Sequence, residues 1–367
     1  MAHRARFSAL FALVAAAIGP ACADDTTTSA GSGGSGSTTD TSASTGGATA
    51  GTGGASAGTG GATAGTGGAT AGTGGATAGT GGAGGGLGTG GGGGPPTIRR
   101  PFLVGRAMRS AKSEARSDWQ LAGRTADDAL DTPTRDMLAM TWLQDAREEH
   151  ASVAAFARWT LLMMSVGAPP ELLRDAQRAS IDEIDHAKAC FSLARRYGGA
   201  DVGPAPLDLD GSLGPMSLVD IAVLTAEEGC VGETLGVALA RVQAEQCEDA
   251  EVKKLLGRLI VDEERHAKLA WTFVAWAIER GGDPVRAAVA DAIARAAKET
   301  LEAPIRSYEG VDVDAWHAHG RLTCAESRDI AREAIAAVIE PALAMLARGP
   351  RAGRSEESTT MAPLALV

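Results

Sequence analysis

Apolar side chains recur at helical spacing through most of the chain beyond residue 130. Together with the Pro, Gly, Ser and Thr residues that flank these stretches, the spacing predicts four long helices, over 132–166, 170–198, 217–247 and 249–280. A fifth helix is expected to start at 283, and a sixth spans 323–348 with a kink at Pro341. The pattern therefore predicts an all-α protein.

The lengths of the connections arrange these helices. Short turns join the first helix to the second and the third to the fourth, whereas the second and third are separated by the Gly- and Pro-rich stretch 199–216. Two antiparallel hairpins joined by one long crossover form a four-helix bundle in which the third helix runs parallel to the second. We expect this bundle over 135–281, preceded by a lead-in segment (99–134) of undetermined structure and followed by additional helices over 282–349.

The first 98 residues show no pattern of a packed core. Residues 1–23 are typical of a signal peptide, with a basic start and an apolar run from Phe7 to Ile18. Two interpretations of its end remain open: ordinary cleavage at Ala21-Cys22-Ala23, or the favoured one, lipidation of Cys22 in a relaxed lipobox. Residues 24–98 are a Gly/Thr/Ala-rich linker with seven-residue repeats, and both this linker and the tail 350–367 are expected to be disordered. We therefore expect an exported lipoprotein, periplasmic or on the outer membrane or cell surface.

Charge and cysteine content narrow the function further. The formal net charge is −11, which disfavours a nucleic-acid partner because phosphate binding requires clustered Lys and Arg. The five cysteines include no CxxC pair, which disfavours a disulfide scaffold and a zinc ribbon.

The two hairpins repeat one motif. Asp182-Glu183-x-x-His186 matches Asp262-Glu263-x-x-His266 at a shift of 80 residues, and Glu148-Glu149 matches Glu227-Glu228 at a shift of 79. Each half thus carries a glutamate pair followed by DExxH. The repeat indicates an internal duplication.

This motif is suited to metal binding. Residues three apart on a helix share a face, so Glu183 with His186, and Glu263 with His266, can each present a carboxylate and an imidazole. One glutamate from each remaining helix would complete a set of four carboxylates and two histidines, which suits iron or manganese. Four carboxylates also balance two divalent ions in a core that does not tolerate unpaired charge.

The two remaining ligands follow from the helical faces. Glu149 shares its face with apolar residues of the first helix, so we expect it to point inward. On the third helix we prefer Glu228, which the duplication pairs with Glu149. Glu233, about 140° further round an α-helix, remains the alternative or an extra ligand. Asp182 and Asp262 are expected to anchor the second nitrogen of the histidines.

These residues resemble the ferritin-like di-iron carboxylate superfamily, which includes rubrerythrins, bacterioferritins and bacterial hydroxylases. The resemblance covers about residues 135–281 and implies a ferritin-like four-helix bundle with two iron ions, or manganese, at Glu149, Glu183, His186, Glu228, Glu263 and His266. It implies chemistry with dioxygen or peroxide, as an oxidase, peroxidase or ferroxidase, on an unknown substrate and with an unknown electron donor. No rubredoxin-like CxxC pair is present, so electron delivery of the rubrerythrin type is not expected. The alternative is an iron-handling or structural surface lipoprotein without turnover.

Overall fold

A computed structural model describes residues 6–19, 100–105, 107–121, 129–305, 308 and 310–348. Cys22, for which lipidation is expected, and the 24–98 linker and 350–367 tail, for which disorder is expected, lie outside these residues. The described part is mostly α-helical, which confirms the all-α class. None of its helices combines the length and apolar character that a membrane span requires.

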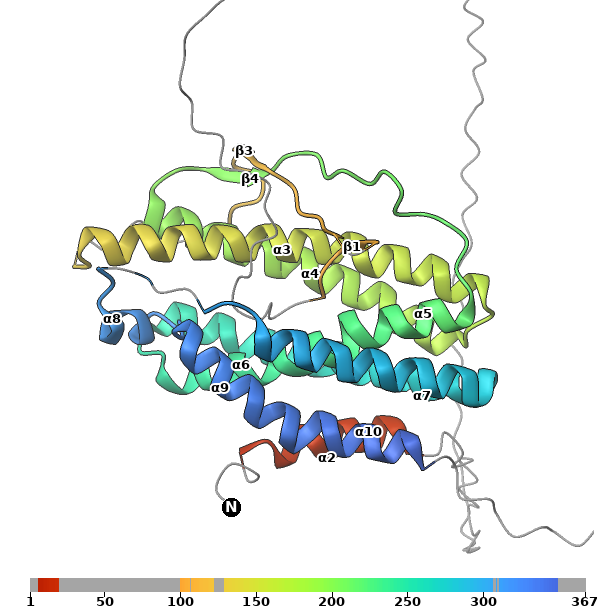
Figure 1. Cartoon of the computed structure of the whole chain (residues 1–367). Helices are drawn as coiled ribbons and strands as arrows, with labels where there is room; N and C mark the ends of the chain where they lie inside the picture. The colour runs from red at the N-terminus through yellow and green to blue at the C-terminus, as the bar shows by residue number, and fades with distance from the viewer. Residues whose placement is uncertain are drawn as a thin grey trace, which may run out of the picture. The chain divides into compact units, whose positions relative to one another are not determined.

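The first two long helices form a hairpin. α3 (Thr132–Ser165) starts where the Asp131 side chain accepts a hydrogen bond from the Thr134 N–H at 2.9 Å, with a proline in its first turn. α4 (Pro170–Gly198) ends at Gly199, whose φ of 75° places it in the left-handed region that favours glycine. The two helices pack side by side along their length (Figure 1).

The third long segment is not a uniform α-helix. α5 (Leu218–Thr225) begins with a capping box between Ser217 and Asp220 and runs into a π-helix, η1 (Ala226–Glu233). The chain then returns to α-helical geometry in α6 (Thr234–Gln246). Sequence periodicity predicted one continuous helix here, and the π-helix changes which side chains share a face.

The fourth segment, α7 (Ala250–Glu302), packs against η1, α5, α6 and α4. Its helical path is interrupted at Gly282, whose φ is 66°, where a break between a fourth and a fifth helix is predicted. The remaining helices are α8 (Val313–Ala318), α9 (Cys324–Ala334) and α10 (Glu340–Ala347). A second π-helix, η2 (Ile335–Ile339), precedes the predicted kink at Pro341.

The N-terminal apolar run forms α2 (Ser8–Ile18), which packs against α7, η2 and α10 (Figure 1). Phe7, Leu10 and Val14 are fully buried in this contact. The surface that covers them comes from helices more than 200 residues away in the sequence. The residues next to this run in the sequence give no sign of that contact.

The segment before α3 folds onto its outer side. β1 (Leu103–Val104) pairs with β2 (Ala107–Met108), and β3 (Ser113–Ala115) pairs with β4 (Val202–Pro204), both antiparallel. We call residues 100–105 and 107–111 the strap. The strap is tied to α3 by Ser152, whose hydroxyl donates to the Arg100 carbonyl at 2.7 Å, and by Arg147, whose Nε donates to the Ala111 carbonyl at 2.6 Å.

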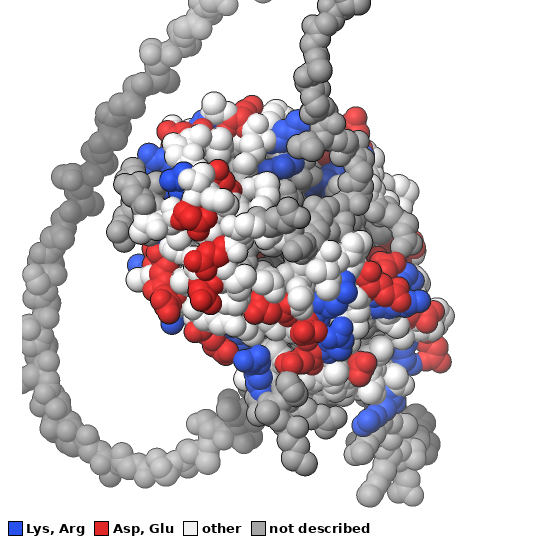
Figure 2. Space-filling view, turned by 60° about the vertical axis from the view of Figure 1, so that its left-hand side comes forward, with Lys and Arg blue, Asp and Glu red and all other residues white. Residues whose placement is uncertain are grey.

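The two largest apolar clusters among the described residues lie at different levels along the long helices. One cluster contains Phe156, Trp159 and Trp271, and the other contains Trp142, Phe191 and Leu259. Between these clusters lies a layer of buried charged residues from α3, α4, η1 and α7. On the outside, acidic and basic side chains are interspersed on the face drawn in Figure 2.

Candidate metal centre

The layer between the two apolar clusters consists of carboxylates and imidazoles. Glu149 comes from α3, Glu183 and His186 from α4, and Glu263 and His266 from α7. All five side chains are buried, with at most 3% of their surface exposed. Charged groups are rarely buried to this extent without a partner, so the layer is a candidate for function rather than for packing.

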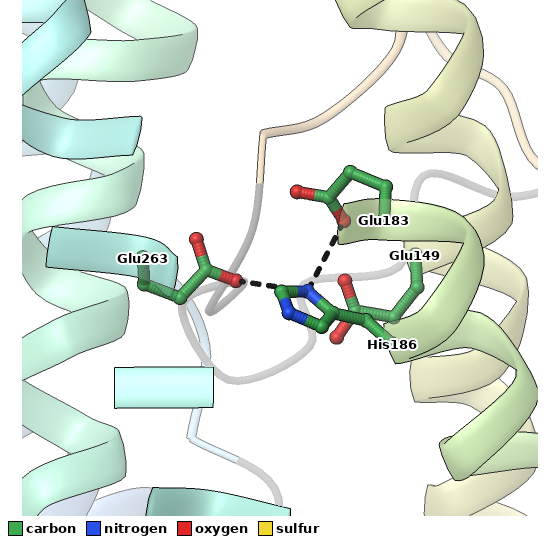
Figure 3. A group of neighbouring side chains, drawn as sticks. All are labelled: Glu149, Glu183, His186 and Glu263. Carbon is green, nitrogen blue, oxygen red and sulfur yellow. Dashed lines mark ion pairs between the residues drawn. The ribbon is translucent and has the colours of Figure 1, made fainter. Parts of the chain in front are cut away.

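Two groups of side chains in this layer are close enough to hold metal ions. Figure 3 shows the first, in which Glu149, Glu183, His186 and Glu263 each offer one ligand atom, and all four atoms lie within 4.8 Å of one another. The second group, within the same limit, is Glu233, Glu263 and His266. Glu263 belongs to both groups, so the two positions are adjacent.

The two motif glutamates both lie between the histidines. The Nδ1 atom of His266 is 3.2 Å from a carboxylate oxygen of Glu183 and 3.2 Å from one of Glu263. The Nδ1 atom of His186 is 3.7 Å from the other oxygen of Glu183 and 3.8 Å from the other oxygen of Glu263. Each carboxylate therefore spans the two imidazoles, the arrangement expected of groups shared by two ions.

The outer nitrogens of the histidines are anchored by the two motif aspartates, but across the halves. His186 Nε2 lies 3.0 Å from Asp262 Oδ2, and His266 Nε2 lies 3.2 Å from Asp182 Oδ2. Asp182 and Asp262 thus contact histidines as expected, although each serves the histidine of the other half. Anchoring of this kind fixes the ring and directs Nδ1 toward the carboxylates.

Arg265 joins the two aspartates. Its guanidinium donates to Asp182 at 3.0 Å and also to Asp262. The corresponding position in the first half is Asp185, so the duplication does not reproduce this arginine. Its charge keeps both aspartates ionised: although burial raises their pKa values, the hydrogen bonds from the histidines and from Arg265 lower them on balance.

Proximity of so many carboxylates changes the protonation of the layer. Burial lowers the pKa of His186, but the hydrogen bond to Asp262 and the nearby Glu183 carboxylate outweigh it and raise the pKa to about 10. The pKa of His266 is raised as well, by Asp182, Glu183 and Glu263 against the effect of burial. Protons on the two imidazoles thus supply the positive charge that the carboxylates need when no metal ion is present.

Glu233, the carboxylate of η1 that belongs to the second group, also has a raised pKa, which favours its neutral form. Burial, the negative charge of Glu263 and that of Glu183 raise the pKa of Glu233 well above its ordinary value. Within the described part of the chain, both buried oxygens of Glu233 accept no hydrogen bond, and the buried Nδ1 of His186 has none either. Unsatisfied groups of this kind fit a cation that would bind them all.

The structure differs from the sequence prediction at Glu228. Its carboxylate lies outside both groups and instead contacts Arg158 Nη2 at 2.8 Å, the Leu103 N–H at 3.3 Å and Arg100 Nε at 3.3 Å. Glu233, the alternative, takes the place beside Glu263 and His266. The reason is the π-helix: its i→i+5 hydrogen bonds bring residues five apart about one turn from each other, whereas an α-helix would separate Glu228 and Glu233 by about 140°.

Three arginines around the layer have roles that sequence reasoning missed. Arg265 could have been noticed as the difference between the two DExxH copies. Arg100 and Arg158 are almost fully buried beside Glu228, yet Arg100 lies in a segment with weak periodicity and carries no recognisable signal.

No protein-family model matches this chain, and neither a curated protein nor a solved structure shows a significant match. The chemistry of the site must therefore be argued from its own residues. Among the described residues, the buried Glu and His side chains form groups that can hold a metal ion.

Proposed function

We propose that this chain is a ferritin-like dinuclear metal protein that binds two iron ions and uses them on dioxygen or peroxide, as an oxidase, peroxidase or ferroxidase. The observation that carries the proposal is the pair Glu183 and Glu263, each of which faces the Nδ1 atoms of both His186 and His266. In this proposal the two glutamates bridge the ions, while Glu149 and Glu233 bind one ion each.

The arrangement of the helices supports the same assignment. α3, α4, the segment α5–η1–α6 and α7 each contribute buried charged residues to one layer, and the connection between α4 and α5 is the long one. A four-helix bundle with a crossover between its second and third helices has this order. This order and the shared layer support the proposed ferritin-like bundle.

In this proposal the protein holds the metal ions and shields them from water. Two bound iron ions would supply Lewis acidity and electrons. The four carboxylates would neutralise their charge, since four negative charges offset two divalent ions. Asp182 and Asp262 would keep the imidazoles oriented, and the apolar clusters on both sides would exclude water from the layer.

Metal binding is tested on the full chain. The purified apoprotein is loaded with Fe(II) under anaerobic conditions, its metal content is measured, and oxygen or peroxide is added while absorbance is recorded. We expect two irons per chain and rapid oxidation. Glu263→Gln should lose metal, whereas the matched control Glu264→Gln, which alters a glutamate 25% exposed and one position along α7, should not. Binding without oxidation would favour iron handling, and an absence of binding would refute the proposal.

Export remains a further part of this proposal, with a separate test. If Cys22 becomes the lipidated N-terminus, α2 is removed with the leader, so the mass and N-terminal sequence of the chain recovered from cells must lack residues 1–21. Recovery of the intact N-terminus would instead leave α2 as a permanent helix of the fold.

A further inference from the structure

The strap places a guanidinium inside the protein. Arg100 precedes all the helices of the candidate site, yet only 1% of its surface is exposed. Its backbone carbonyl accepts the hydrogen bond from Ser152 described above, which fixes the start of the side chain against α3. The layer of charged residues is therefore completed by a segment outside the four long helical segments.

The guanidinium of Arg100 lies close to the candidate metal centre. Its Cζ is 4.9 Å from the ring centroid of Phe156 and 4.2 Å from that of Trp159. Phe156 in turn contacts the imidazole of His266, with a centroid distance of 5.0 Å. Only one aromatic ring thus separates this cation from an expected metal ligand.

Arg100 has few partners for a buried cation. Its Nε lies 3.3 Å from Glu228 Oε2, but none of its three nitrogens donates a hydrogen bond to a residue that the structure describes. The space that it occupies depends on Gly229, where a Cβ atom would lie 3.2 Å from Arg100 Nη1. A buried charge with unused donors contributes little to stability by itself. The effect of Arg100 is therefore expected on the position of the Glu228 carboxylate.

Glu228 is held on the strap side of the π-helix by three groups. Arg158 and the Leu103 N–H contact one of its oxygens, and Arg100 lies beside the other. Glu233, on the same π-helix, is directed toward Glu263 and His266 instead. Residues five apart in a π-helix lie about one turn from each other, so the two carboxylates leave η1 from adjacent turns.

We propose that Arg100 is a positioning residue that retains Glu228 on the strap and thereby makes Glu233 the ligand of the second metal ion. Without the guanidinium, Glu228 would be a buried carboxylate with one of its two cationic partners removed. Arg158 would remain its one cationic partner, and in this proposal the released Glu228 side chain would rotate toward the metal position that Glu233 serves. This inference rests on the proposed dinuclear site.

The test is a binding cycle with Co(II) as the probe, measured on the full chain by competition with a chelator and by the visible absorption of bound cobalt. Glu233→Gln is introduced into the unaltered chain and into Arg100→Gln. We expect a loss of affinity of about tenfold or more in the unaltered chain, but about threefold or less in Arg100→Gln, because Glu228 then substitutes. Adding Glu228→Gln to the double variant should restore the full loss.

A control and a fallback keep the result interpretable. Arg109→Gln alters the same strap, where Arg109 pairs with Asp208 at the surface at 2.6 Å, and should leave the effect of Glu233→Gln unchanged. If Arg100→Gln loses its native circular dichroism, the single variants decide: Glu228→Gln should keep its Co(II) affinity within about threefold, and Glu233→Gln should not.

Two results would overturn the inference in distinguishable ways. An equal loss on Glu233→Gln with and without Arg100, or a larger loss on Glu228→Gln than on Glu233→Gln, shows that Arg100 does not select the ligand while the metal site stands. Failure of the unaltered chain to bind any Co(II) or Fe(II) removes the dinuclear site itself, and this inference with it.

Discussion

The crossed contacts between aspartates and histidines yield a quantitative prediction. Asp262→Asn removes the charge that faces His186, the histidine of the other half, at 3.0 Å. Hydrogen bonds to charged groups contribute about 1.5–3 kcal/mol. The Asp262 side chain is 23% exposed and also bonds Arg265, so we take the lower end and expect a coupling of about 1.5 kcal/mol with His186.

This coupling can be measured without metal. Urea unfolding at neutral pH in the presence of a chelator gives the free energies of unfolding of the unaltered chain, Asp262→Asn, His186→Gln and the double variant, and the cycle isolates their interaction. The comparison cycle pairs Asp182→Asn with His186→Gln, two residues four apart on α4, and should show less than about 0.5 kcal/mol. If the second cycle shows the larger coupling, each histidine is anchored within its own half and the crossed arrangement is incorrect.

Three other outcomes follow from the site. Because Asp262 and Glu183 outweigh burial and raise the pKa of His186 to about 10, metal binding at pH 7 should release protons, and metal affinity should rise from pH 6 to 9. Calorimetry in buffers of different ionisation enthalpy would reveal the proton release. A pH-independent metal affinity would contradict the prediction. The same shift stabilises the metal-free fold fully below the ordinary pKa of 6.5, and this contribution is lost as pH rises through about 10, so the urea midpoint of the apoprotein should fall between pH 7 and 10 unless His186 is neutral. Gly229→Ala should lower the free energy of unfolding by about 1–3 kcal/mol, because its Cβ would lie 2.6 Å from that of Ala270; an unchanged melting temperature would show that the π-helix can yield.

Much of the helical organisation was readable from local chemistry. α3 and α4 start and end at the predicted Pro and Gly positions, since caps and helix breakers act within a few residues of where they stand. The inward direction of Glu149, Glu183 and Glu263 was equally accessible, because an uninterrupted α-helix fixes which residues share a face.

Other features depend on contacts between distant segments. Nothing in the sequence marks η1 as a π-helix, so the spacing of an α-helix favoured Glu228 over Glu233 as the metal ligand. The duplication reinforced that choice by pairing Glu228 with Glu149. The pairing of each aspartate with a histidine depends on how α4 packs against α7. These helices carry motif copies 80 residues apart, so the motif alone does not determine the pairing.

In each half of the site, the aspartate that anchors the histidine comes from the other half, so the two hairpins cannot be separated without losing these contacts. A polypeptide cut within 199–216 would give two hairpins, each with its own glutamate and histidine, yet neither would hold the aspartate that steadies its imidazole. Neither piece would be a functional module by itself, whereas the two mixed, or two copies of one hairpin related by a twofold axis, would restore the missing contacts. Each hairpin therefore depends on the other for the aspartate that orients its histidine.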